Sequence, residues 1–255
     1  MQPRQAPLEA QHYAQFLEDR QATIAFFQEH RFQSDSDTEE RSLRARWFQR
    51  LAAEHLYITY TAGHPVESLP PLLEALVEHV EHRQQMLAQY ERQPLIAPFA
   101  IDHWPDEYLE CTQLFALCIL LGRPDLLARV AALMDQANFV ASDTLYEDLL
   151  MRVLPDRHDV DEWFHDYCTP LVQAIYADTP EEASTLLATY CEGWYAAFEH
   201  APWHDSHVDD DGRFFGYWAF EAAAIAYLYD IDDSAIDHRV YPRDLVDYAR
   251  RQRPR

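Results

Sequence analysis

Apolar residues recur at three- and four-residue spacing along most of the chain, which is the period of α-helices. The most apolar stretch runs from Phe214 to Tyr229, and Glu221 is its one charged residue. A segment that is hydrophobic on all sides is typical of a buried helix. The pattern therefore predicts a central helix over 213–229. Its small residues form a stripe that would let a neighbouring helix approach closely: Gly216, Ala219, Ala223 and Ala226.

Proline and capping residues mark the other helix boundaries, because the chain contains only 5 glycines for tight turns. Ser36 with Glu39 and Thr179 with Glu182 have the spacing of capping boxes. We expect Pro170 to kink or split the helix in which it lies. The remaining helices are predicted at 8–33, from the 34–40 loop to about Gly63, from Pro70 to Tyr90, at 105–121, 125–138, 143–154 and 159–177, from Pro180 to about Phe198, and after Pro242.

About ten helices and no convincing strand predict an all-α fold, with antiparallel helical hairpins in a compact bundle or an irregular stacked array. No fixed repeat period is present, so a regular solenoid is not supported. We expect an N-terminal long-helix part at 1–120 and a C-terminal helical part at 121–255. One continuous unit is the alternative.

The charge of the chain narrows the class of partner. It contains 44 acidic against 20 basic residues, a formal net charge of -24. Nucleic acids and anionic membranes would repel such a surface, so the charge favours a basic partner or simply solubility. The four cysteines form no C-x-x-C pair, and the N-terminus has no apolar signal core. We expect a reduced, cytoplasmic protein, although export without a cleaved signal stays open.

Candidate metal sites lie near the acidic stretch at 204–211. The spacing His207-x-Asp209-x-Asp211 superficially resembles a calcium loop, but an EF-hand requires acidic ligands at its first and twelfth positions, here His207 and Trp218. The imidazoles of His200, His204 and His207 would suit zinc. Surface histidines are the commoner explanation, because Pro202 interrupts any helix that would align the first two. We therefore predict no metal.

No catalytic motif stands out either. The chain has no nucleophile elbow, phosphate loop or dinucleotide fingerprint, and close acid pairs arise by chance among so many acids. We predict no catalytic residue, no cofactor and no enzymatic activity. Glu221 is expected to be a buried strut, with a binding or catalytic role as the alternative. Burying it requires a partner such as a tyrosine hydroxyl, a backbone donor, or one of three arginines: Arg213, Arg239 or Arg243.

One stretch is similar to a known family. The segment GYWAFEAAAIAYLYDIDD, followed by HRVYPRDLVDYAR, resembles the C-terminal signature of the PoNe immunity proteins, the PoNi-type family of bacterial toxin antagonists. The resemblance covers residues 216–250, and the N-terminal part adds no sharp motif. The residues that carry it are Gly216, Tyr217, Trp218, Glu221, Ala222, Ala223, Tyr241, Pro242, Asp244 and Leu245.

The resemblance implies a cytoplasmic, non-enzymatic protein that neutralises a cognate DNase toxin delivered between competing bacteria, for example by type VI secretion. An acidic inhibitor would be steered to the basic DNA-binding cleft of a DNase and would cover it. We expect the interface at both ends of the central helix. The alternatives are an acidic helical scaffold for another basic partner and, third, a metal-dependent enzyme. The expected interface residues are Trp203, Asp205, Asp209, Asp210, Asp211, Tyr229, Asp230, Asp232, Asp233 and Asp237.

Overall fold

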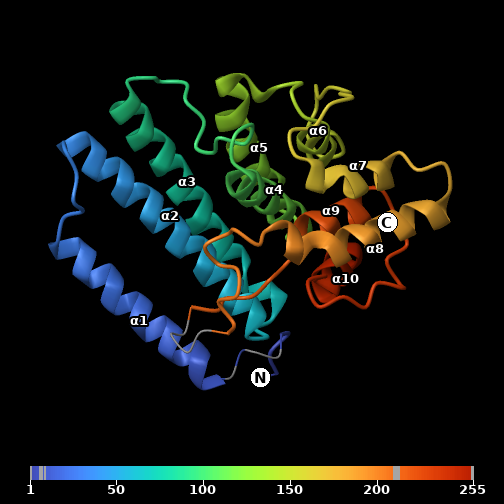
Figure 1. The fold of residues 1–255 in the computed structure, drawn as a ribbon, viewed down its shortest axis with the longest axis horizontal. Coiled ribbons are helices and arrows are strands. Elements are labelled where there is room, and N and C mark those ends of the chain that lie inside the picture. Colours follow the sequence, from blue (N-terminus) through green and yellow to red (C-terminus); the bar gives the residue numbers. More distant parts are fainter. Residues whose placement is uncertain (1, 6–7, 9, 209–212, 254–255) are drawn as a thin grey trace. The chain divides into compact units, whose positions relative to one another are not determined.

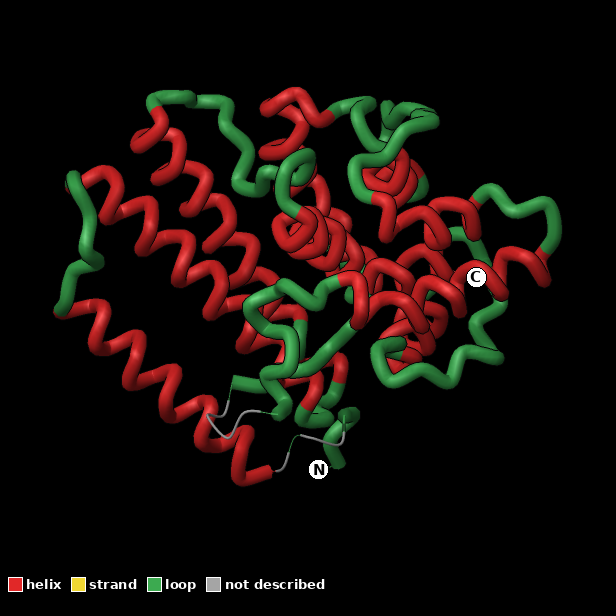
Figure 2. Tube along the Cα trace, viewed as in Figure 1, coloured by secondary structure: helices red, strands yellow, loops and turns green. Residues whose placement is uncertain are grey.

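The computed structural model describes residues 2–5, 8, 10–208 and 213–253, and these fold as helices and loops with no strand among them (Figure 2). The all-α prediction is therefore confirmed. The structure forms two compact units. The first unit comprises Met1–Pro98 and Pro202–Gly216, and the second comprises Phe99–Ala201 and Tyr217–Arg255. The division of the chain at residue 120 stays a prediction.

The first unit is built on three long helices, which lie side by side in chain order (Figure 1). They are α1 (Ala10–Glu29), α2 (Asp37–Thr61) and α3 (Pro70–Glu91). Prolines at the first turn of α3 fit the N-terminal position where a missing N–H is harmless. The core between α2 and α3 consists of aliphatic side chains at helical spacing, all 2% exposed or less: Leu56, Leu73, Leu76, Val77 and Val80.

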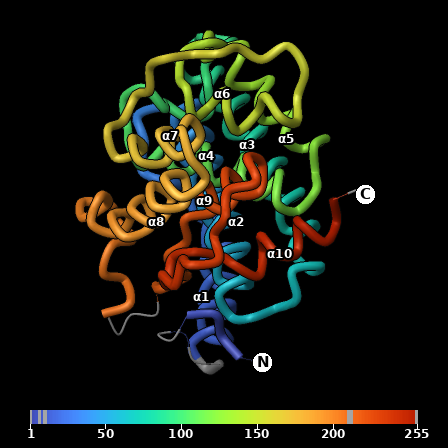
Figure 3. Tube along the Cα trace, turned by 90° about the vertical axis from the view of Figure 1, so that its right-hand side faces the viewer, coloured from blue at the N-terminus to red at the C-terminus, as the bar shows by residue number. Residues whose placement is uncertain are grey.

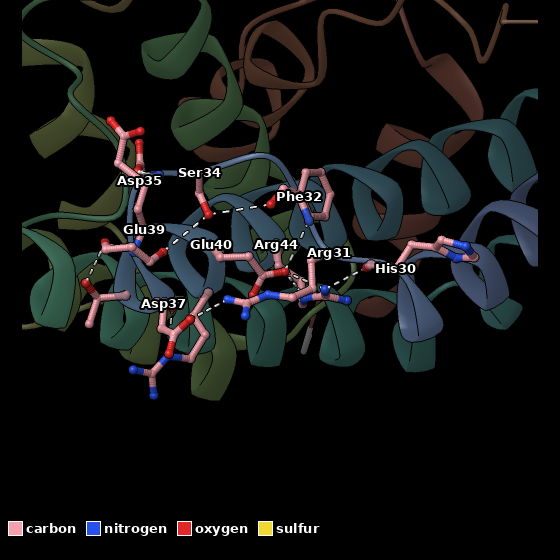
Figure 4. A network of polar contacts seen from close by, with 12 residues as sticks. His30, Arg31, Phe32, Ser34, Asp35, Asp37, Glu39, Glu40 and Arg44 are labelled. Carbon is pink, nitrogen blue, oxygen red and sulfur yellow. Dashed lines mark hydrogen bonds and ion pairs between the residues drawn. The ribbon is translucent and has the colours of Figure 1, made fainter.

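The turn from α1 to α2 is held by the polar network shown in Figure 4. The Ser36 hydroxyl accepts a hydrogen bond from the Glu39 N–H at 3.2 Å, which confirms this predicted helix start. The Arg44 guanidinium pairs with Glu40 and donates to the backbone carbonyls of Phe27 and His30. Arg44 therefore satisfies carbonyl groups that the end of α1 leaves without helical partners.

The second unit surrounds the buried helix α4, which contacts α5, α6, α9 and α10. Helices α7, α8 and α9 lie together in two views at right angles (Figures 1 and 3). The Thr179 hydroxyl accepts from the Glu182 N–H, as predicted for the start of α8. The helices of this unit are α4 (Pro105–Leu120), α5 (Pro124–Met134), α6 (Thr144–Met151), α7 (Thr169–Ile175), α8 (Pro180–Ala197), α9 (Phe220–Leu228) and α10 (Arg243–Gln252).

The central helix is shorter than the hydrophobic pattern predicts. It begins at Phe220 instead of residue 213, because Gly216 has a φ of 110°, outside the helical range. In the second unit, the Ala219 N–H donates to the carbonyl of Val240 at 2.9 Å, and the Gln113 amide donates to the Trp218 carbonyl at 2.6 Å. Long-range hydrogen bonds therefore replace the first helical turns.

The predicted helix at 159–177 is wrong over its first half. Only a 3₁₀ turn at Asp166–Cys168 and α7 are helical there. The Thr144 N–H donates to the Glu162 carbonyl at 2.8 Å, and the Phe164 N–H donates to the Asp143 carboxylate at 2.8 Å. These bonds connect the segment to the start of α6 and use backbone groups that a helix would need.

Candidate functional site

Helix α9 carries a carboxyl group into the core of the second unit. Glu221 is 1% exposed, and its Oε1 accepts hydrogen bonds from the Tyr190 hydroxyl and the Trp194 indole N–H, both at 2.8 Å. Its Oε2 has no hydrogen-bond partner among the described residues. Burial raises the pKa of Glu221 to about 7, opposed by a backbone hydrogen bond and by donors from Tyr190, Trp194 and Gln113.

The partners of Glu221 are aromatic donors. A tyrosine hydroxyl was among the expected partners, but Trp194 was not, because nothing in the sequence places α8 against α9. The two arginines of the second unit that were expected as partners, Arg239 and Arg243, contact groups other than Glu221. Arg243 donates to the carbonyls of Asp233 and Ile236, and the Arg239 guanidinium lies 5.5 Å from the Tyr195 ring centroid.

The loop that follows α9 is held from inside by Asp233. This residue is 4% exposed, and its carboxylate accepts from the Tyr241 hydroxyl at 2.6 Å and from the Arg250 guanidinium at 2.8 Å. The Arg243 guanidinium donates to the Asp233 backbone carbonyl at 2.9 Å. Tyr241 and the two arginines thus fix the loop after α9, and Asp233 is engaged within the chain.

Three acids of this loop are exposed: Asp230, Asp232 and Asp237. The Asp230 carboxylate pairs with Arg253 at the surface. The Asp232 carboxylate accepts from the Ser234 N–H at 2.9 Å, and this bond lowers the pKa of Asp232. These carboxylates reach solvent from a loop that is anchored by Asp233.

Tyr229, at the start of the loop, is half-buried. Its hydroxyl donates to the Asp148 carboxylate at 3.0 Å, and the Arg152 guanidinium lies 4.9 Å from its ring centroid. Of the positions that carry the resemblance, Tyr217 and Trp218 are buried, and Asp244 is half-buried in the first turn of α10.

The other expected interface residues belong to the first unit. Trp203 is half-buried, and Asp205 is exposed with a φ of 58°. Trp203 contributes to a pocket of about 120 Å³ whose lining includes Arg50, Glu54 and Arg213. Three of the predicted interface acids lie outside the described residues: Asp209, Asp210 and Asp211.

The structure adds a second acidic segment, at 152–166, which the expected interface does not include because a helix is predicted from residue 159. Within the segment, the buried Arg157 guanidinium pairs with Asp135 at 2.7 Å and with Glu147 at 2.8 Å. Only 6% of the Arg157 side chain is exposed. Around this anchor the segment exposes five acids: Asp156, Asp159, Asp161, Glu162 and Asp166.

The described part of the chain offers little that could bind a metal ion. No group of three or more His, Cys, Asp or Glu side chains there is arranged to hold a metal ion. His200 is fully at the surface, 3.6 Å from the Glu199 carboxylate, and His204 lies 3.8 Å from Asp205. Across the same residues, no helix has the length and apolarity that crossing a membrane requires.

Two comparisons place the chain among known proteins. Residues 141–245 match the family model described as PoNe immunity proteins (PoNi), C-terminal. The fold is similar to the crystal structure of protein PA2201 from Pseudomonas aeruginosa, with a TM-score of 0.73 and 20% sequence identity, over 98% of this chain and 92% of that chain. At that identity the likeness concerns the fold alone. No curated protein matches the chain.

Proposed function

We propose, from the similarity of residues 141–245 to the C-terminal part of the PoNe immunity proteins, that the chain binds and neutralises a cognate DNase toxin. The match contains both α9 and the loop after it. It supports a binding protein without enzymatic activity. We assign it to the cytoplasm, in keeping with four buried, unpaired cysteines.

The mechanism that we propose is electrostatic cover of the DNA-binding cleft of the toxin. A nuclease must attract phosphates, so its cleft is basic, and an inhibitor with a net charge of -24 is drawn toward it. Single exposed ion pairs contribute only about 0 to 1 kcal/mol each. Several carboxylates acting together raise the association rate more than any one pair raises the affinity.

The observation that carries the proposal is the loop after α9. Asp230, Asp232 and Asp237 are exposed there, while Asp233 in the same loop is buried and bonded to Tyr241 and Arg250. The loop therefore presents charge without having to become ordered on binding, which removes part of the entropic cost of association. In the first unit, the exposed Asp205 stays a separate candidate for a contact with the toxin.

The test uses the full chain and the nuclease domain of a candidate cognate toxin, sought in the genes that neighbour its own. Wild type should co-purify with that domain and block its cleavage of DNA. Neutralising Asp230, Asp232 and Asp237 to Asn should lower the association rate about tenfold at low salt, and the loss should shrink as salt rises. The matched control changes three exposed acids of the first unit by the same total charge: Glu67→Gln, Glu74→Gln and Glu78→Gln.

The outcomes separate two failures. If both triple variants bind equally fast, the loop is not the interface, while the immunity function stands. If wild type neither binds the nuclease nor protects DNA, the function itself is refuted.

A further inference from the structure

Asp148 is a buried carboxylate of the second unit with one unused oxygen. It lies on α6 and is 1% exposed. Its Oδ1 accepts from the hydroxyls of Tyr176 and Tyr229, each at 3.0 Å, and its Oδ2 has no hydrogen-bond partner in the described part of the chain. Leaving a buried acceptor without a donor is costly, so such an atom requires an explanation.

The surroundings of Asp148 are acidic. The pKa of Asp148 is raised to about 6, mainly by desolvation and also by the negative charge of Asp159, while the two hydroxyl donors and Arg152 lower it. Asp159 and Asp161 also act on Tyr176, whose pKa is raised mainly by burial and by Asp148. We call these residues the Asp148 cluster: Asp148, Arg152, Asp159, Asp161, Tyr176 and Tyr229.

The cluster reaches the surface through the ring of Tyr176, which is 53% exposed. Helices α6, α7 and α9 meet here, and the first two are joined by the acidic segment (Figures 1 and 3). Arg152 already lies over the Tyr229 ring, but no ion pair joins it to Asp148. The cluster therefore combines an exposed ring, a carboxylate with an unused oxygen and two exposed acids.

The geometry points to a ligand: we propose that the Asp148 cluster receives an arginine side chain of the toxin. This inference rests on the proposed function. A guanidinium presents planar, paired N–H donors that suit a carboxylate, and its face stacks on aromatic rings. Rotation of the half-exposed Tyr176 side chain would give it access to Oδ2. A lysine ammonium would satisfy the charge but neither the paired donors nor the ring.

The acids around Tyr176 are held in place before any ligand arrives. Arg157 bonds to Asp135 and Glu147, and the His158 N–H donates to the Glu147 carboxylate at 3.2 Å. The Thr144 hydroxyl donates to the Val160 carbonyl at 2.7 Å, between the two exposed acids. A prearranged acidic site binds a cation with less ordering cost than a mobile one.

The test measures the affinity of the nuclease domain for wild type, Asp148→Asn and Tyr176→Phe. Asp148→Asn should weaken binding about tenfold to a hundredfold, the range for a lost hydrogen bond to a charged group. Asp159→Asn with Asp161→Asn provides a second variant at exposed positions, where folding is not at risk, and should weaken binding about fivefold. Asp247→Asn, an exposed acid of α10, is the matched control and should not change the affinity.

Arginine itself is identified by double-mutant cycles with arginine-to-alanine variants of the nuclease domain. One of these arginine-to-alanine variants should weaken binding to wild type but should cause no further loss of affinity when it is tested with Asp148→Asn. Strong wild-type binding that neither Asp148→Asn nor the double variant weakens would overturn the cluster as a site and leave the immunity function intact. A weakening that couples to lysines alone would overturn the choice of arginine. If wild type does not bind, the proposed function has failed instead.

Discussion

The Glu221→Gln variant tests whether the buried carboxyl of α9 makes the stability of the fold depend on pH. Glutamine keeps an oxygen that can accept from Tyr190 and Trp194, and it removes the ionisation. The pKa of Glu221 is about 7 in the folded chain, against an ordinary glutamate pKa of 4.5. Between these two pH values the folded state holds a proton that the unfolded state has lost, so stability must fall as the pH rises through this window.

The size of the effect follows from the same two values. Their difference of about 2.5 units, at 1.36 kcal/mol per unit, corresponds to about 3 kcal/mol of stability lost across the full window. The titratable neighbours of Glu221 do not change their protonation in this pH window. Their ordinary pKa values already lie above it, and burial raises them further: Tyr167, Cys168, Tyr190 and Cys191. Gln113 and Trp194 carry no titratable group.

The assay is urea unfolding of wild type and Glu221→Gln at about pH 5 and about pH 8. The variant should gain about 2 kcal/mol relative to wild type between the two conditions, because most of the window lies between them. Any constant cost of a buried amide cancels in this comparison. Glu192→Gln, at an exposed position of α8, should show no such gain. A stability difference between Glu221→Gln and wild type that is the same at both pH values would refute the reasoning.

Three further changes test how the irregular segments and helix ends are held. Arg157→Met should lower the free energy of unfolding by about 3 kcal/mol in urea titrations, because it leaves Asp135 and Glu147 without their cation. A loss as small as that caused by replacing a surface arginine would contradict this prediction. Arg44→Ala should lower the free energy of unfolding by about 1 kcal/mol, and amide hydrogen exchange should speed up first at the end of α1. Unchanged exchange at that helix end would show that the Arg44 contact does not stabilise it. Thr179→Ala should cost about 1 kcal/mol of stability while Thr179→Ser costs little, and equal losses would mean that the cap is not the cause.

The helices were predictable where local chemistry alone determines them. The starts at Ser36, Pro70, Pro105 and Thr179 lie where capping residues and first-turn prolines place them, because these signals act within one turn. The all-α fold follows from the same short-range information. The membership of residues 202–216 in the first unit was not predictable, since the helices of that unit are far away in sequence.

The two largest errors have one physical cause. The segments at 159–165 and 213–219 were both predicted to be helical from their apolar residues, yet their backbone groups bond to distant partners such as Asp143, Val240 and Gln113. Apolar composition says that a segment is buried and leaves its backbone conformation open. For the same reason the arrangement around Asp148 was invisible in the sequence, because its partners Tyr176 and Tyr229 come from two other helix ends.

The two acidic segments of the second unit share one construction. Each is held by an ion pair between a carboxylate and an arginine, Asp233 with Arg250 and Glu147 with Arg157. Exposed carboxylates lie on the irregular backbone around each pair. A helix would also display acids, but on a regular face whose spacing is set by the helical period. An irregular loop places charges at spacings that a helix does not allow, and its internal ion pair keeps that pattern from being averaged by motion. Specificity for one toxin requires such a pattern, because net charge alone would attract any basic protein.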